Sequence, residues 1–175
     1  LAAGTTAAGW AYAADRFDGG VWLFAAVLIS WLVAVAAVDL CTLLIPNRLL
    51  VLGGAVTGPA ALLTGFTAWP EALGGGLALS AVLLGSALLV RDGLGGGDVK
   101  LGALLGFVLG WKLALLALFL AFLLAAGVGA LLILLKRKRR SDVMAFGPFL
   151  AAGACIALFW GAQLVDGYLR AAARP

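Results

Sequence analysis

The sequence has no histidine, only two cysteines and few charged residues. Without histidine, the chain has no Ser-His-Asp or Cys-His nucleophilic site, no histidine-ligated zinc and no imidazole general base. Cys41 and Cys155 lie far apart and form no CxxC pair, so a structural zinc site is not expected either. We therefore predict no metal and no cofactor. Acid–base chemistry must come mainly from the eight carboxylates.

The scarcity of charge defines the class of protein. Charged residues make up 11% of the 175 residues and hydrophobic residues 65%, whereas a soluble domain carries about 25% charged residues. This composition excludes an ordinary cytosolic enzyme and predicts an all-α bundle of transmembrane helices, one integral-membrane domain over residues 1–175. Five of the twelve basic residues form one run at 136–140. We interpret this run as a topology anchor that contacts membrane lipids, not as a nucleic-acid site.

Apolar stretches predict six transmembrane spans and a weaker one before them, because a spanning helix needs about 20 apolar residues. The six spans cover residues 21–38, 49–66, 72–90, 97–111, 113–135 and 145–165. Residues 1–14 are apolar but short. We expect them to be a helix continued from an upstream part. A signal peptide cleaved near residues 11–13 is the alternative, but no basic segment precedes it.

The basic residues predict the orientation in the membrane, since cytoplasmic loops are enriched in Lys and Arg. If the run at 136–140 is cytoplasmic, Arg48, Arg91 and Lys100 are cytoplasmic too, which places eight of the twelve basic residues on that side. The end of the 21–38 span and the start of the 97–111 span then face the cytoplasm.

Asp39 ends an apolar span and is followed by another apolar stretch, with no basic residue before Arg48. A carboxylate in this position costs free energy unless it has a function or a partner. The alternative is a carboxylate at the level of the lipid headgroups, with no chemical role.

Asp98 follows a glycine-rich segment at 93–97 that completes neither a GxGxxG dinucleotide fingerprint nor a phosphate loop. The 97–111 span is only about 22 Å long, against about 30 Å of hydrocarbon, which draws Asp98 to interfacial depth. Glycines at 102, 106 and 110 form a stripe of small residues, and Asp98 continues it by one turn. We therefore expect Asp98 to face the helix bundle; the alternative is a charge in a flexible loop.

The other six carboxylates are interpreted as loop charges: Asp15, Asp18, Glu71, Asp92, Asp142 and Asp166. Asp39 and Asp98 remain, at one membrane face and at similar depth. Two carboxylates that share a water can hydrolyse an amide, one as base and the other as acid, and like charges in contact cannot both ionise readily. Asp98 begins a helix, where the dipole favours the anion, so we expect Asp98 to act as base and Asp39 as acid.

Three blocks of the sequence resemble the type IV prepilin peptidase family, which are membrane aspartic proteases of the GxGD kind. Residues 39–47 (DLCTLLIPN) resemble the family's first catalytic aspartate and its Ile-Pro-Asp/Asn turn. Residues 95–101 (GGGDVKL) resemble its GxGDxKL block, and residues 146–151 (FGPFLA) resemble the stretch that opens its last helix. Each motif is weak alone, but the three occur in order on one predicted membrane side, and the resemblance covers nearly the whole chain.

The resemblance implies that Asp39 and Asp98 are the catalytic pair of an aspartic endopeptidase. It implies that the enzyme cuts the basic leader from prepilin or pseudopilin precursors at the cytoplasmic face of the prokaryotic inner membrane, and that an apolar helix follows the cut. Many relatives also carry an N-terminal domain with paired CxxC motifs and methylate the new N-terminus. Residues 1–175 contain no such motif, so methyltransferase activity is not predicted for them.

Further motif residues are given structural or substrate-related roles: Pro46, Asn47, Gly95, Gly97, Lys100, Gly147 and Pro148. Pro46-Asn47 suits a turn that starts a helix, and Gly147-Pro148 suits a helix start. Gly95 and Gly97 allow close approach of other groups. Lys100 either stabilises the aspartate pair or anchors at the headgroups.

Two other functions remain open. A small proton- or ion-coupled transporter also places carboxylates near glycine-broken helices. Against it, the sequence shows no inverted repeat, and both acids lie at one face instead of the midplane. A membrane subunit of a secretion machine with no chemistry of its own is the other. A cleavage assay with a prepilin-like substrate separates the peptidase from both.

Overall fold

The fold is a bundle of helices, seen in a computed structural model that describes residues 19–89, 95–136 and 144–172. Every secondary-structure element in these ranges is a helix, which confirms the predicted class. The elements are α2 (Gly19–Thr42), α3 (Asn47–Leu63), α4 (Trp69–Leu89), α5 (Gly96–Leu134) and α6 (Gly147–Ala172). The predicted first span at 1–14 and most of the basic run at 136–140 lie outside the described residues.

Four of the described helices, α2, α4, α5 and α6, are long and apolar enough to cross a membrane. Helix α3 is also apolar but has only 17 residues. The described ranges thus hold five helices, fewer than the six or seven predicted spans. The reason is that the spans predicted at 97–111 and 113–135 both fall within α5, whose backbone leaves helical geometry at Gly110.

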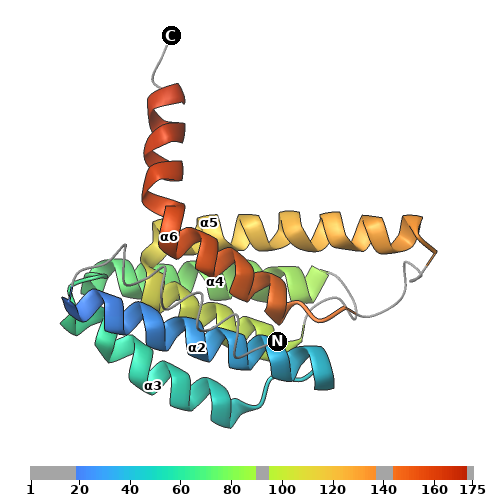
Figure 1. Cartoon of the computed structure of the whole chain (residues 1–175), viewed down its shortest axis with the longest axis horizontal. Helices are drawn as coiled ribbons and strands as arrows, with labels where there is room; N and C mark the ends of the chain where they lie inside the picture. Colours follow the sequence, from blue (N-terminus) through green and yellow to red (C-terminus); the bar gives the residue numbers. More distant parts are fainter. Residues whose placement is uncertain (1–18, 90–94, 137–143, 173–175) are drawn as a thin grey trace.

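Gly110 divides α5 into two arms. Its φ of 73° and ψ of 164° lie in a region that glycine adopts far more readily than other residues. Figure 1 shows the chain turning back here, so that the two arms run in roughly opposite directions. A break of this kind leaves carbonyl groups of the preceding turn without helical donors. The hydroxyl of Thr67 donates to one of them, the carbonyl oxygen of Val108, at 2.6 Å.

Successive helices alternate in direction along the bundle (Figure 1). Helix α5 contacts α3, α4 and α6, and α2 contacts α3 and α6. The end of α2, the starts of α3 and α6, and the start of α5 therefore come to one end of the bundle. Below, this end is called the aspartate end. The end that holds Gly110 and the start of α4 is called the kink end.

The first arm of α5 packs closely against α4 through the predicted glycine stripe. Gly102, Gly106 and Gly110 are all buried, which confirms that the stripe faces the bundle. A side chain at Gly106 would collide with the backbone of Gly75 in α4, and one at Gly102 would collide with Leu83. Small residues at these contacts let the two helices approach closely, as in other membrane bundles.

Candidate active site

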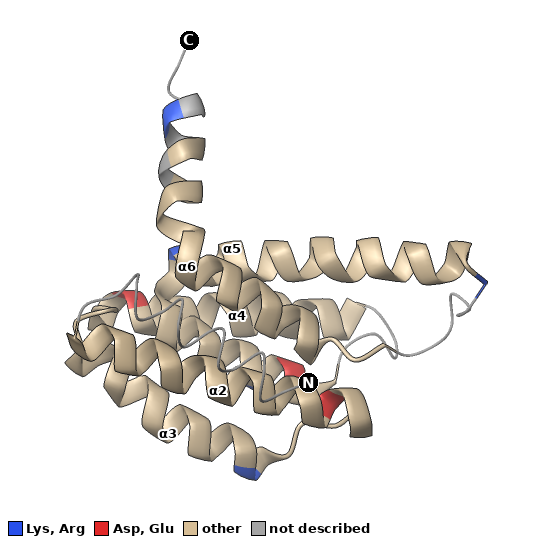
Figure 2. Cartoon of the chain, viewed as in Figure 1, with Lys and Arg blue, Asp and Glu red and all other residues tan. Residues whose placement is uncertain are grey.

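The aspartate end is held together by contacts between segments far apart in the sequence. Ile45, in the turn between α2 and α3, packs on Gly97 at the start of α5, where an added Cβ would lie 3.1 Å from the Ile45 Cβ. Lys100 in α5 donates a 2.9 Å hydrogen bond to the side-chain oxygen of Asn47 in α3. Figure 2 shows the acidic segments of α2 and α5 at this end and that of α4 at the other.

Asp39 lies near the end of α2 and is buried, with 4% of its surface exposed. Its Oδ2 accepts a 2.9 Å hydrogen bond from the backbone N–H of Gly147, the first residue of α6. A Cβ at position 147 would lie 2.6 Å from that oxygen. Position 147 therefore requires glycine, because any side chain would push the carboxylate away.

Asp98 is the third residue of α5 and is 8% exposed. Its Oδ2 accepts a 3.2 Å hydrogen bond from the backbone N–H of Gly95, which precedes the helix. Its other oxygen, Oδ1, is buried and has no hydrogen-bond partner within the described residues. A buried acceptor left unpaired is rare in folded proteins and calls for an explanation.

The two carboxylates form a pair set apart from the other charged groups. They are the only charged side chains that are buried among those whose burial the structure describes. Both lie at the aspartate end, where the end of α2 and the start of α5 come together. The structure thus brings together the two residues that the sequence singles out, and it buries Asp98 as the glycine stripe predicts. Two like charges in a buried site cannot both ionise readily.

A second helix bears on the roles predicted for the two aspartates. The prediction considered only the helix that carries each residue, and Asp39 does lie near the C-terminal end of α2. However, the carboxylate of Asp39 reaches the N-terminal end of α6 through Gly147, just as Asp98 lies at the N-terminal end of α5. Both carboxylates therefore receive a backbone N–H at a helix start, and only Asp39 also lies at a helix C-terminal end. The assignment of Asp98 as base and Asp39 as acid stays a prediction.

The supporting motif residues have structural positions. Pro46 precedes the first residue of α3, and its carbonyl accepts hydrogen bonds from Leu49 and Leu50, as expected for a helix start. Lys100 donates a hydrogen bond to Asn47, a contact that the sequence did not predict, and its two expected roles stay predictions. In the described ranges no ion pair joins Lys100 to either aspartate. Pro148 is the second residue of α6, as its motif predicts.

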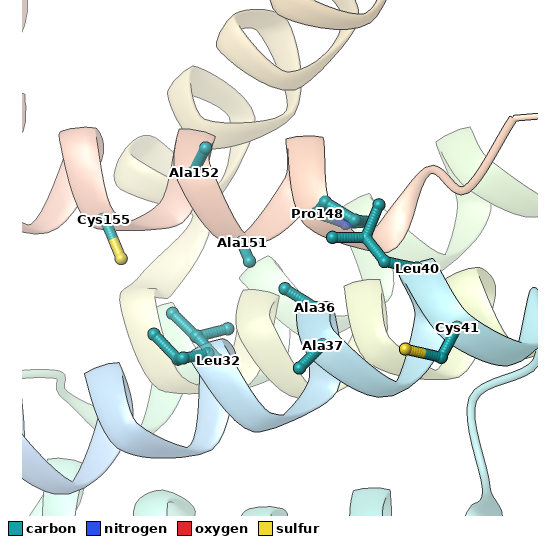
Figure 3. A pocket seen from close by; sticks show the side chains of 10 residues that line it. Leu32, Ala36, Ala37, Leu40, Cys41, Pro148, Ala151, Ala152 and Cys155 are labelled. Atoms are coloured by element: carbon teal, nitrogen blue, oxygen red, sulfur yellow. The ribbon is translucent and has the colours of Figure 1, made fainter. Parts of the chain in front are cut away.

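An apolar groove of about 500 Å³ runs between α2 and α6 and begins beside the aspartate pair. Leu40 in α2 and Pro148 in α6 border it, each next in sequence to a residue of the Asp39–Gly147 contact. Figure 3 shows Ala36 of α2 and Ala151 of α6 pointing toward each other, with Cys41 and Cys155 toward opposite ends. The groove could not be predicted from the sequence, because it depends on how α2 and α6 pack.

Comparison with known proteins identifies the family of this chain. A family model described as the type IV leader peptidase family matches residues 26–130. The chain is 36% identical over 168 residues to the prepilin leader peptidase/N-methyltransferase of Bacillus subtilis, covering 95% of this chain and 68% of that relative. It is 38% identical over 154 residues to the protein of the same name from Aeromonas hydrophila, covering 83% of this chain.

The chain spans about half the length of several of these relatives: 52% of the Aeromonas hydrophila protein and 56% of one from Xanthomonas campestris, to which it is 34% identical. No solved structure matches the chain. The family match extends over both aspartates and more than half of the chain. It confirms the resemblance seen in the motifs: this multi-pass membrane protein belongs to the type IV leader peptidase family.

Proposed function

We propose that this protein is a membrane-embedded aspartic endopeptidase that removes the leader peptide from prepilin-like or pseudopilin precursors. Asp39 and Asp98 activate the water that attacks the scissile amide. The observation that carries the proposal is the burial of these two carboxylates at one end of the bundle, where they are the only buried charged side chains among those whose burial is described. The names of the relatives, prepilin leader peptidases, support the choice of substrate.

In the proposed mechanism the pair holds one proton. The ionised carboxylate takes a proton from water as the water oxygen bonds to the carbonyl carbon, and the protonated carboxyl donates its proton to the carbonyl oxygen. The tetrahedral intermediate then collapses. The C–N bond breaks, a proton passes to the departing nitrogen, and the products are a carboxylate on the leader and an amine on the mature chain. Because the two groups titrate together, the apparent pKa values belong to the pair.

The protein backbone orients both carboxylates for this reaction. Gly147 fixes one oxygen of Asp39, and Gly95 fixes one oxygen of Asp98. Oδ1 of Asp98 has no hydrogen-bond partner in the described part of the chain, so it is free to interact with water or with the substrate carbonyl. Holding reacting groups in a fixed geometry supplies a large share of catalytic power.

We place the aspartate end at the cytoplasmic face of a bacterial inner membrane. Support comes from the basic residues at that end: Arg48 and Lys100 lie near the starts of α3 and α5, and Lys136 follows the end of α5. Cytoplasmic ends of membrane helices are enriched in such residues. A leader with positive charge would also be attracted to the anionic pair. Methyltransferase activity, the second activity in the relatives' names, is not proposed for residues 1–175.

A cleavage assay tests the proposal. Membranes that contain the protein are incubated with a prepilin-like precursor, and the shortened product is measured at equal amounts of folded enzyme. Asp39→Asn and Asp98→Asn should each lower the rate at least about 1,000-fold, because neither variant can share a proton between two carboxylates.

Glu71→Gln is the matched control. Glu71 is also an acid in the first turn of a helix, but it is exposed and lies at the kink end. This variant should cleave at the wild-type rate. Cleavage by both aspartate variants would overturn the proposal. Absence of cleavage by the wild type, with proton-coupled uptake that both variants lose, would favour the transporter instead.

A further inference from the structure

The groove between α2 and α6 has the chemistry of a binding site for an apolar helix. Its walls carry aliphatic side chains, alanines, one proline and two thiols, and no charged residue. Both helices are among those long and apolar enough to span the membrane, so the groove lies beside lipid. A peptide segment in such a place must satisfy its own backbone groups, which only a helix does, and its side chains must be apolar.

The position of the groove indicates which helix it binds. The groove starts at Leu40, which follows Asp39 and is 66% exposed, and at Pro148, which follows Gly147. A peptide whose scissile bond lies at the aspartate pair therefore has the groove directly beside it. We propose that this groove binds the apolar helix of the substrate that adjoins the scissile bond, an inference that rests on the function proposed above.

The dimensions fit two turns of such a helix. From Leu40 to Leu32 on α2 there are eight residues, and from Pro148 to Cys155 on α6 there are seven, which correspond to about 12 Å and about 10 Å of helix. Alanines from both helices face the groove, Ala36 and Ala151 among them (Figure 3). Small side chains let a third helix approach the other two closely, which is how helices associate in membranes.

The two cysteines of the chain allow a direct test, because Cys41 and Cys155 line opposite ends of the groove and both are free. Single cysteines are placed along the apolar segment of a prepilin-like precursor. Each precursor is mixed in membranes with Asp98→Asn enzyme that retains only Cys41 or only Cys155, and disulfides are formed with copper phenanthroline. Cys41 should link to positions nearest the scissile bond, and Cys155 to positions about two helical turns farther along.

The pattern of cross-links decides between occupants. Links that recur at helical spacing, in the order just given, support the proposal. Links between two copies of the enzyme in place of links to the precursor would assign the groove to a second copy and overturn it. If neither cysteine forms a link although wild-type enzyme cleaves the precursor, lipid occupies the groove. That result would also overturn the proposal.

Two variants test the groove by cleavage. Ala37→Phe and Ala152→Phe fill it from its exposed alanines, and Ala81→Phe adds the same side chain to an exposed position on α4 outside it. For each enzyme, kcat/KM for the whole precursor is divided by kcat/KM for a peptide that ends shortly after the scissile bond. The groove variants should lower this ratio about tenfold through lost apolar contact, and Ala81→Phe should not change it.

The experiments distinguish an error in the groove proposal from an error in the peptidase assignment. If the ratio stays constant in both groove variants while the precursor is cleaved, the groove proposal is wrong and the peptidase stands. If wild-type enzyme cleaves nothing but the cysteines link to the precursor in the predicted order, the groove binds the helix and the peptidase assignment is wrong.

Discussion

The two ends of the first arm of α5 differ in whether their buried polar groups have hydrogen-bond partners. At the kink end, the hydroxyl of Thr67 bonds to the carbonyl of Val108, and Glu71 is exposed to its surroundings. At the aspartate end, two carboxylates are buried together, and Oδ1 of Asp98 has no partner in the described ranges. Asp98 and Glu71 both lie in the first turn of a helix. Burial, and not helix position, separates the candidate catalytic acid from the ordinary one.

Under the proposed function, this difference separates an end built for stability from an end built for chemistry. At an end that serves stability alone, buried polar groups have hydrogen-bond partners, because a buried polar group without one costs about 1–3 kcal/mol of stability. A site that must bind water and a peptide carbonyl keeps an acceptor available and bears that cost. Substitutions at one end at a time test this difference.

Gly147→Ala should have the largest effect of the single changes outside the two aspartates. The new Cβ would lie 2.6 Å from Oδ2 of Asp39, so the carboxylate must move. A displacement of this size costs roughly 100-fold in rate. Cleavage is measured at equal amounts of folded protein. Gly74→Ala in α4, where an added Cβ meets nothing within 4 Å, is the control and should cleave normally. Equal rates for both variants would contradict the role of the Gly147 contact.

Loss of the hydrogen bond between Lys100 and Asn47, also at the aspartate end, should lower the cleavage rate less than Gly147→Ala does. Lys100→Met or Asn47→Ala should lower kcat roughly threefold to tenfold, since both partners are exposed and their bond is weak. The double variant should be no worse than either single one. Asn47→Asp keeps the acceptor and should retain activity. Additive losses would show that the two residues act separately.

Thr67→Val should affect stability and leave cleavage unchanged. It removes the donor to the buried carbonyl of Val108, which should cost about 1–2 kcal/mol and lower the melting temperature in detergent. Its rate per folded molecule should equal that of the wild type. A loss of activity as large as that of Gly147→Ala, without a change in melting temperature, would mean that the two ends are not separable.

Much of this arrangement could be predicted from local patterns in the sequence. Apolar runs locate the helices, and the glycines at 102, 106 and 110 correctly orient Asp98 toward the bundle. The division of α5 at Gly110 matches the boundary between two predicted spans, although the exact turn could not be placed, because either side of it is equally apolar.

Contacts between distant helices could not be predicted. The Asp39–Gly147 bond joins residues 108 positions apart, and the Lys100–Asn47 bond joins residues 53 apart. Both depend on how the helices pack, which no single-helix pattern encodes. For the same reason, neither the contact of Asp39 with the start of α6 nor the α2/α6 groove could be predicted.

The central claim is that Asp39 and Asp98 act as one unit that holds a single proton. The most direct test is the dependence of kcat/KM on pH for cleavage of a prepilin-like precursor by wild-type enzyme in membranes. A bell-shaped profile is expected, with kcat/KM falling about tenfold per pH unit on each side. The reason is that the pair is inactive when it holds two protons and when it holds none. A profile with only one limb, or with none, would contradict the claim.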